Sequence, residues 1–276
     1  MASREVHDMA KVGFGEGTNE LYDRARPTYP SPSLDFMRAK LTGNGPFNIV
    51  EIGSGTGLFT RTLLAHPQWK DCVGKIHAVE PSPGMRQTFQ AKTQDDRISV
   101  ADGTFTQTGE KDNWADAVVV AQAFHWAHPN YDGAMAEIAR ILKPNGTAFF
   151  IWNMEDRDSA RWVARVRELY ESHEADTPQF RRNLWEEAFK TASYISSFHA
   201  PERFYTDWMV PTTNSGVQDR VLSKSYITAL SEEEKKTLCI GIEGVLGEEE
   251  KTWIDQSVGS FQYPYKTTVI AMKRLS

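Results

Sequence analysis

The chain has 276 residues, of which 40% are hydrophobic and 25% charged, as in a globular protein with one large domain or a core domain carrying a cap. The formal net charge of −6 argues against a nucleic-acid-binding protein, whose surface is usually basic. The sequence contains no run of 18 apolar residues, so no membrane span is predicted. The two cysteines, Cys72 and Cys239, lack metal-ligand spacing. We therefore expect a cytoplasmic protein without metal, membrane or nucleic-acid partners, and the oligomeric state stays open.

The first half of the chain alternates between apolar segments and helical patterns. Residues 1–20 are polar and glycine-rich, which predicts a mobile arm, and a proline-rich turn then leads to a helix at 33–41. Strands are predicted at 48–53, 75–81, 98–103, 115–124 and 147–154, with intervening helices at 56–66, 83–93 and 131–146. This alternation predicts βαβ units and a doubly wound parallel sheet.

The pattern changes after residue 154. Residues 157–195 have the composition of two helices rich in aromatic residues and arginine. A strand is predicted at 202–210, and helices at 216–230 and 231–246. A β-branched, apolar strand at 261–274 closes the chain. We interpret the region before this last strand as a cap inserted into the fold.

The segment "VEIGSGTG" (50–57) places Gly53, Gly55 and Gly57 at the end of the first strand, where open α/β sheets bind ligands. The spacing differs from the G-x-G-x-x-G of dinucleotide-binding proteins. Glu51 precedes the loop, and a carboxylate there would repel a pyrophosphate but attract a cation. The pattern favours S-adenosylmethionine (SAM), which carries a sulfonium and no phosphate, over a nicotinamide dinucleotide.

Acidic residues also end the next two strands. Glu80, at the end of the second strand, is suited to accept hydrogen bonds from both ribose hydroxyls. Asp102, at the end of the third, could accept from an adenine amino group. Either acid alone is equally typical of a strand end or a helix cap, but three acids at successive strand ends favour a nucleoside ligand.

Four segments resemble, in order, the motifs of class I SAM-dependent methyltransferases: "VEIGSGTG", "AVEPSPGM", "VADGTF" and "ADAVVVAQAFHW". The chain is further similar to the small-molecule methyltransferases related to trans-aconitate methyltransferases, through "YDRARPTYP" (22–30), His125-Trp126 and "YPYKTTVIAMKR". The resemblance implies a Rossmann-like, seven-stranded, mainly parallel sheet with a helical cap. Its expected parts are an N-terminal arm and lid (1–30), a SAM-binding core (31–154), a cap with the sixth strand (155–260) and a closing strand (261–276).

The resemblance also implies a cofactor site along the strand ends, with S-adenosylhomocysteine as the product. The glycine loop would hold the methionine moiety and ribose, Gln122 to Phe124 would lie beside the sulfonium, and Arg26 would suit the SAM carboxylate. The expected cofactor-binding residues are Tyr22, Arg26, Glu51, Gly53, Ser54, Gly55, Gly57, Glu80, Pro81, Met85, Asp102, Gly103, Thr104, Gln122, Ala123 and Phe124.

The acceptor side is less defined by sequence. His125 is a candidate catalytic base or a pocket-wall residue, and Trp126 and Trp152 are candidate substrate-binding or core residues. Arginines of the cap could clamp an acidic substrate or lie on the surface: Arg161, Arg165, Arg181 and Arg182. We expect a methyltransferase that acts on a small molecule, with a carboxylate or hydroxyl oxygen favoured and nitrogen or sulfur possible. The alternative is a SAM-binding regulatory protein without turnover.

Overall fold

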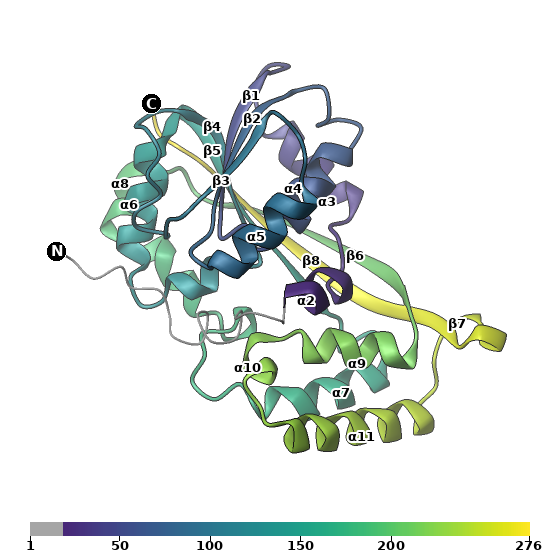
Figure 1. Ribbon diagram of the computed structural model, residues 1–276. Coiled ribbons are helices and arrows are strands. Elements are labelled where there is room, and N and C mark those ends of the chain that lie inside the picture. Colours follow the sequence, from purple (N-terminus) through teal and green to yellow (C-terminus); the bar gives the residue numbers. More distant parts are fainter. Residues whose placement is uncertain (1–18) are drawn as a thin grey trace.

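The computed structural model describes residues 19–276, so residues 1–18 of the mobile arm predicted for 1–20 lie outside the described residues, and residues 19 and 20 belong to a helix. Within the described range an eight-stranded sheet has the order β3-β2-β1-β4-β5-β8-β6, with β7 paired to β8 (Figure 1). The strands are β1 Phe47–Ile52, β2 Val73–Val79, β3 Ile98–Ala101, β4 Ala115–Ala121, β5 Leu142–Glu155, β6 Glu202–Thr212, β7 Trp253–Asp255 and β8 Ser260–Lys273.

The sheet is mainly parallel, as predicted. β1 to β5 pair in parallel, whereas β8 runs antiparallel to both β5 and β6. The chain therefore has the α/β, doubly wound architecture expected of it. The predicted number of seven strands is one too low. The additional strand is β7, which has three residues and pairs with the first residues of β8. Three exposed residues are too few to show an alternating pattern, so β7 has no sequence signal.

Two hydrophobic layers enclose the sheet because its central strands are apolar on both faces. Val118 and Val120 point into one layer, against α6 (Tyr131–Ile141), η3 (Leu184–Lys190) and α8 (Ala192–Ser197). Val119 points into the other, against α3 (Ser31–Ala39) and α4 (Leu58–Ala65). The helix α5 (Pro83–Lys92) follows β2. The glycine loop follows β1, at the edge of the sheet where the parallel strands have their carboxyl ends.

Several predicted boundaries are corrected. The helix predicted for 131–146 ends at Ile141, and β5 already begins at Leu142. β4 ends at Ala121 instead of 124, because Gln122 has a positive φ of 56° and a 3-10 helix, η1 (Phe124–Ala127), follows. Only α7 (Arg161–Glu171) is a long helix within 157–195; η2 (Phe180–Arg182), η3 and α8 are short turns of helix. The proline-rich turn is preceded by a helix that was not predicted, α2 (Asn19–Ala25).

The cap has its own hydrophobic cluster. Trp162 and Tyr170 of α7 pack with residues of α9 (Asn214–Leu222), α10 (Ser225–Thr228) and α11 (Glu232–Glu248), and with the first part of β8. Figure 1 shows these helices gathered at one end of the molecule, with α2 between them and the sheet. No helix among residues 19–276 combines the length and apolar character that a membrane crossing needs.

Candidate functional site

The glycine loop after β1 is built from three residues with positive φ: Gly53 (72°), Gly55 (55°) and Gly57 (83°). A Cβ on Gly53 would lie 2.7 Å from that of Ala123, and one on Gly57 would lie 2.7 Å from the Phe89 ring. At Gly55 the nearest atom would be the Met85 sulfur, 4.0 Å away. Gly53 and Gly57 are therefore required by packing, whereas Gly55 faces open space.

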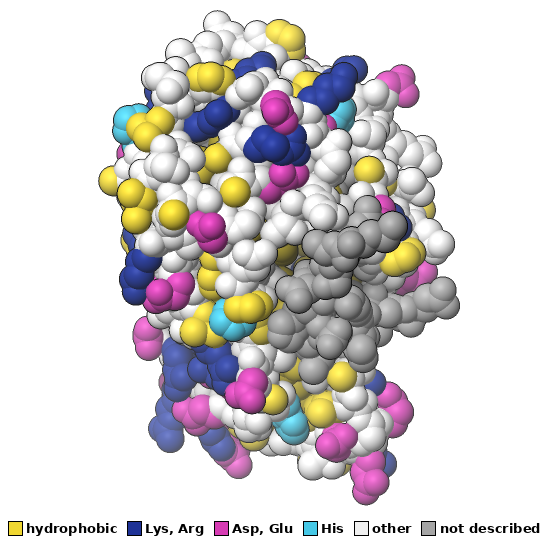
Figure 2. Space-filling view, turned by 90° about the vertical axis from the view of Figure 1, so that its left-hand side faces the viewer, with side chains coloured by type: hydrophobic (Ala, Val, Ile, Leu, Met, Phe, Trp, Pro, Cys, Tyr) yellow, Lys and Arg dark blue, Asp and Glu magenta, His cyan; other side chains and the backbone are white. Residues whose placement is uncertain are grey.

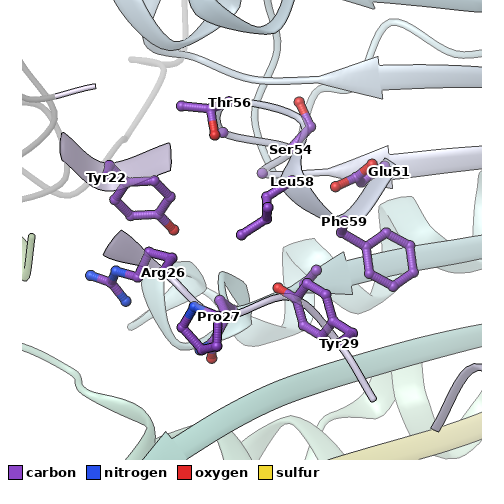
Figure 3. A pocket seen from close by; sticks show the side chains of 13 residues that line it. Tyr22, Arg26, Pro27, Tyr29, Glu51, Ser54, Thr56, Leu58 and Phe59 are labelled. Atoms are coloured by element: carbon purple, nitrogen blue, oxygen red, sulfur yellow. The ribbon is translucent and has the colours of Figure 1, made fainter. Parts of the chain in front are cut away.

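That space is a pocket between the loop and the N-terminal segment, which we call the cofactor pocket. Figure 3 shows the hydroxyl groups of Tyr22 and Tyr29 directed into it, opposite Ser54 and Leu58. Its lining residues are Tyr22, Arg26, Pro27, Tyr29, Glu51, Gly53, Ser54, Gly55, Thr56, Leu58, Phe59, Ala121 and Gln122. Seven of these were predicted from the sequence. The sequence analysis missed Pro27, Tyr29, Thr56, Leu58, Phe59 and Ala121.

Glu51 is the acidic group of this pocket, and its side chain is buried. Burial raises its pKa to about 8, against the opposing effects of a hydrogen bond from the Thr60 hydroxyl and the charge of Arg61. Neutral in the empty pocket at physiological pH, this carboxyl would ionise beside a cationic ligand, because an opposite charge favours the ionised form.

The cofactor pocket also contains an unsatisfied polar atom. The Ser54 hydroxyl oxygen is buried and has no hydrogen-bond partner in the part of the chain that the structure describes. Buried polar groups are normally paired, so this hydroxyl fits a polar ligand. Together with the open space at Gly55 and the buried carboxyl of Glu51, it makes the pocket compatible with the methionine moiety of SAM.

Glu80 supports the loop. Its Oε2 accepts from the Gly55 amide over 2.9 Å, and its Oε1 accepts from the Ser82 amide over 2.8 Å. Burial raises the pKa of Glu80, while the two amides and Arg86 act to lower it. Arg86 donates to the Glu80 carbonyl over 2.6 Å and contacts Asp102 Oδ1 at 3.3 Å. The two acids predicted to bind the nucleoside therefore lie next to each other.

The other predicted cofactor residues do not line this pocket: Gly57, Glu80, Pro81, Met85, Asp102, Gly103, Thr104, Ala123 and Phe124. Two of them have clear packing roles. Phe124 is fully buried and stacks on Phe150 with ring centroids 3.9 Å apart. A Cβ on Gly103 would lie 2.6 Å from a methyl group of Val79. Their contacts with a cofactor remain predictions.

The helix α2 is fastened to the core through Asp23. This carboxylate accepts from the Thr56 hydroxyl over 2.7 Å, from Arg61 over 2.5 Å and from Lys92 over 2.7 Å. Its pKa is lowered: burial acts to raise it, but the hydrogen bonds from Lys92, Thr56 and Arg61 outweigh that effect. One acidic side chain therefore links the predicted lid to the glycine loop and to α5.

A second pocket, which we call the acceptor pocket, shares Tyr22, Arg26 and Gln122 with the cofactor pocket. The N-terminal segment, the sheet and the cap all contribute to it. Its lining residues are Tyr22, Arg26, Gln122, His125, Trp126, Asn153, Met154, Tyr170, Glu174, Gln179, Phe180, Arg220, Lys224, Ser225 and Tyr226. The predicted residues His125 and Trp126 lie here, next to the shared wall.

Trp152 orients the His125 ring through a hydrogen bond. Its indole N–H donates to His125 Nδ1 over 3.3 Å, so a neutral His125 carries its own proton on Nε2. Trp152 is fully buried and stacks on Phe180 with ring centroids 4.7 Å apart. It supports His125 but does not occur among the described residues that line the acceptor pocket, and its predicted contact with substrate remains a prediction.

The cap arginines singled out in the sequence are mostly engaged in ion pairs. Arg165 contacts Glu248 and Glu249, each at 2.8 Å, and Arg181 contacts Glu174 at 2.5 Å. The cations that line the acceptor pocket are instead Arg26, Arg220 and Lys224. Arg220 lies in α9 and Lys224 just beyond its end, and no local pattern in the sequence distinguished these two residues from other cap cations.

The chain is similar to known methyltransferases. A family model described as a methyltransferase domain matches residues 50–150. An uncharacterised methyltransferase of Mycobacterium tuberculosis (strain ATCC 25618 / H37Rv) is 31% identical over 228 residues, which are 82% of this chain and 83% of that protein. An uncharacterised methyltransferase-like protein of Schizosaccharomyces pombe is 32% identical over 169 residues, 61% of this chain; the chain spans 62% of that relative's length.

A solved structure shows the same fold. Phosphoethanolamine N-methyltransferase 2 of Haemonchus contortus, in complex with SAM, superposes with a TM-score of 0.52 at 14% sequence identity. The match covers 89% of this chain and 52% of the other.

Proposed function

Because this chain belongs to the SAM-dependent methyltransferase family, we propose that it transfers the methyl group of SAM to a small molecule held in the acceptor pocket. The observation that carries the proposal is the wall of Tyr22, Arg26 and Gln122 that the two pockets share. Because the two pockets adjoin at these residues, a methyl donor bound in one would lie next to an acceptor bound in the other, as direct transfer requires.

The surroundings of the acceptor pocket support a small acceptor. Residues from α2, the core and the cap surround it, which suits a molecule enclosed on several sides. On the face shown in Figure 2, Lys and Arg side chains gather at the lower left and near the top, but Asp and Glu side chains lie beside them in both places, so this face carries no continuous basic surface of the kind that a nucleic-acid substrate would favour.

An oxygen of a carboxylate or hydroxyl is the acceptor atom that the polar lining favours; nitrogen and sulfur are less favoured alternatives. SAM supplies an electrophilic methyl group when bound. An acceptor oxygen would form the new C–O bond as the C–S bond breaks, with the electrons of that bond left on sulfur. A carboxylate needs no base for this step, whereas a hydroxyl must also lose a proton.

We assign His125 the role of a hydrogen-bond donor to the acceptor. Its Nδ1 accepts from Trp152, so in a neutral ring the proton is on Nε2, which is the nitrogen able to act as a donor. The protein would therefore bind and orient an oxygen anion here without removing a proton from it. His125→Gln should raise KM for the acceptor and leave the SAM dissociation constant unchanged.

We also propose membership of the small-molecule methyltransferases related to the trans-aconitate methyltransferases. The turn that carries this resemblance contributes Arg26, Pro27 and Tyr29 to the cofactor pocket. This supports the predicted lid function of the segment, because the turn itself forms part of the wall over the glycine loop.

The test is label transfer from methyl-labelled SAM. The protein is incubated with a cell extract separated by ultrafiltration into low-mass and macromolecular fractions. We expect protein-dependent labelling of the low-mass fraction and equal formation of S-adenosylhomocysteine. Labelling confined to macromolecules would overturn the small-molecule assignment. SAM binding without consumption in any fraction would instead support a regulatory protein without turnover.

A further inference from the structure

The acceptor pocket contains an excess of positive charge. Arg26, Arg220 and Lys224 line it. The buried carboxylate of Glu155 contacts Arg220 at 2.7 Å and Lys224 at 3.1 Å, and so offsets only one of these charges. Arg26 donates to the hydroxyl and carbonyl oxygens of Ser223, over 3.0 and 2.8 Å, and these groups are neutral. Burial and the charge of Arg220 lower the pKa of Lys224 to about 7, but the two guanidinium groups alone exceed the single carboxylate of Glu155, and a bound anion would favour the charged form of Lys224. Buried charges are normally paired, so this imbalance points to a missing anion.

Arg220 has a free donor inside this cluster. Its Nε donates to the Tyr265 hydroxyl over 3.2 Å and its Nη2 pairs with Glu155. Its Nη1 is buried and has no hydrogen-bond partner among residues 19–276, and the whole side chain is 3% exposed. A buried guanidinium donor left without an acceptor is costly, and an anionic ligand would satisfy it.

The carboxylate that lines the pocket, Glu174, does not neutralise the cluster. Glu174 is paired with Arg181 at 2.5 Å and accepts from the Tyr226 hydroxyl over 3.2 Å. Lys224 is held in place against the Tyr170 ring, with its Nζ 4.2 Å from the ring centroid. The cations are thus fixed by neighbours that leave their charge uncompensated.

We propose that Arg220 and Lys224, assisted by Arg26, form a subsite for an anionic group of the methyl acceptor. A carboxylate and a phosphate share the required chemistry, a planar or tetrahedral set of oxygens that accepts from guanidinium and ammonium groups. An acceptor whose only charge is a protonated amine is disfavoured, because like charges would meet without water between them. Glu155 positions the two cap cations for this contact. The inference rests on the proposed small-molecule function.

The test separates the low-mass extract by ion exchange into anionic, neutral and cationic fractions before incubation with the protein and methyl-labelled SAM. We expect labelling from the anionic fraction. Labelling from only the neutral or cationic fraction would overturn the subsite while leaving the proposed function intact, and no low-mass labelling at all would overturn the proposed function itself. Phosphatase treatment of the anionic fraction distinguishes the sources: it abolishes labelling if the anion is a phosphate and spares it if the anion is a carboxylate.

Substitutions at Lys224 and Arg165 test whether Lys224 belongs to the proposed anion subsite. Lys224→Met leaves the Glu155–Arg220 pair in place and should raise KM for the anionic fraction about tenfold or more, with the SAM dissociation constant unchanged. Lys224→Arg should restore most of the affinity. Arg165→Met is the matched control, because it removes a cap cation that pairs with Glu248 and Glu249 outside the pocket. Equal KM values for Lys224→Met, Arg165→Met and the unmodified protein would contradict the subsite.

Discussion

The amide of Gly55 donates to Glu80 Oε2 over 2.9 Å, and this hydrogen bond joins the glycine loop after β1 to the end of β2. The Ser82 amide occupies the other carboxylate oxygen. The residue predicted to bind the ribose therefore also holds the loop that would surround the methionine moiety. Changes at Glu80 should affect cofactor binding through both contacts.

Replacing Glu80 should weaken SAM binding. We expect Glu80→Ala to cost about 1.5–3 kcal/mol of binding free energy, the range for hydrogen bonds to a charged group. Glu80→Gln keeps one oxygen acceptor and should lose less. Calorimetric titration with SAM measures both, and circular dichroism checks the fold. An unchanged SAM affinity in the folded Ala variant would remove Glu80 from the site.

Gly55 is predicted to be needed for the ligand more than for the fold. Gly55→Val should abolish SAM binding because its side chain would enter the open space of the cofactor pocket, and the positive φ should cost about 1–2 kcal/mol of stability. Gly109→Val is the matched control: Gly109 has φ 77° and no atom within 4 Å of a Cβ, but it does not line the pocket. Normal SAM affinity in Gly55→Val, or a stability loss far above that of the control, would contradict this assignment.

SAM affinity should rise with pH through the ionisation of Glu51. The pKa of this group is raised to about 8 in the empty protein, so its carboxyl is mostly neutral below that pH. A bound cation favours the ionised form, lowers the pKa and releases a proton, and affinity therefore increases from about pH 6.5 towards about pH 8.5.

Calorimetry in buffers of different ionisation enthalpy measures this proton release. Glu51→Gln should bind SAM with less dependence on pH and release fewer protons. If SAM affinity depends on pH in the same way in the variant and the unmodified protein, Glu51 does not ionise when SAM binds.

The lid predicted at the N-terminus depends on Asp23. Amide hydrogen exchange at residues 20–30 should slow when S-adenosylhomocysteine binds, because closure over the ligand protects this segment. Asp23→Asn weakens the contacts with Thr56, Arg61 and Lys92 and should speed exchange there in the ligand-free protein. Arg24→Ala serves as a control, since Arg24 makes one exposed ion pair with Asp219. Protection that does not change on binding would exclude a lid.

The sequence predicted the sheet well because its signals are local. The buried strand around Val118 to Val120 and the glycines after β1 follow from periodicity and from backbone requirements that neighbouring residues specify. The loop residue Gly55 could be recognised for the same reason. Motif resemblance then located the cofactor site.

The acceptor side could not be predicted in the same way. Arg220 and Lys224 lie far along the chain from Arg26, and only the folding of the cap onto the lid brings them together. Arg165 and Arg181 have equally suggestive positions in the sequence, but nearby acids on the cap pair with them. Which arginines reach a pocket depends on tertiary packing, and local spacing does not encode it.

The most direct test of the account is a crystal structure of the protein with S-adenosylhomocysteine. We predict that the homocysteine moiety lies against Gly53 to Gly55, with Glu80 at the ribose. We also predict that the sulfur faces Gln122 at the wall shared with the acceptor pocket. A ligand whose sulfur lies away from that wall would contradict the proposed path of methyl transfer.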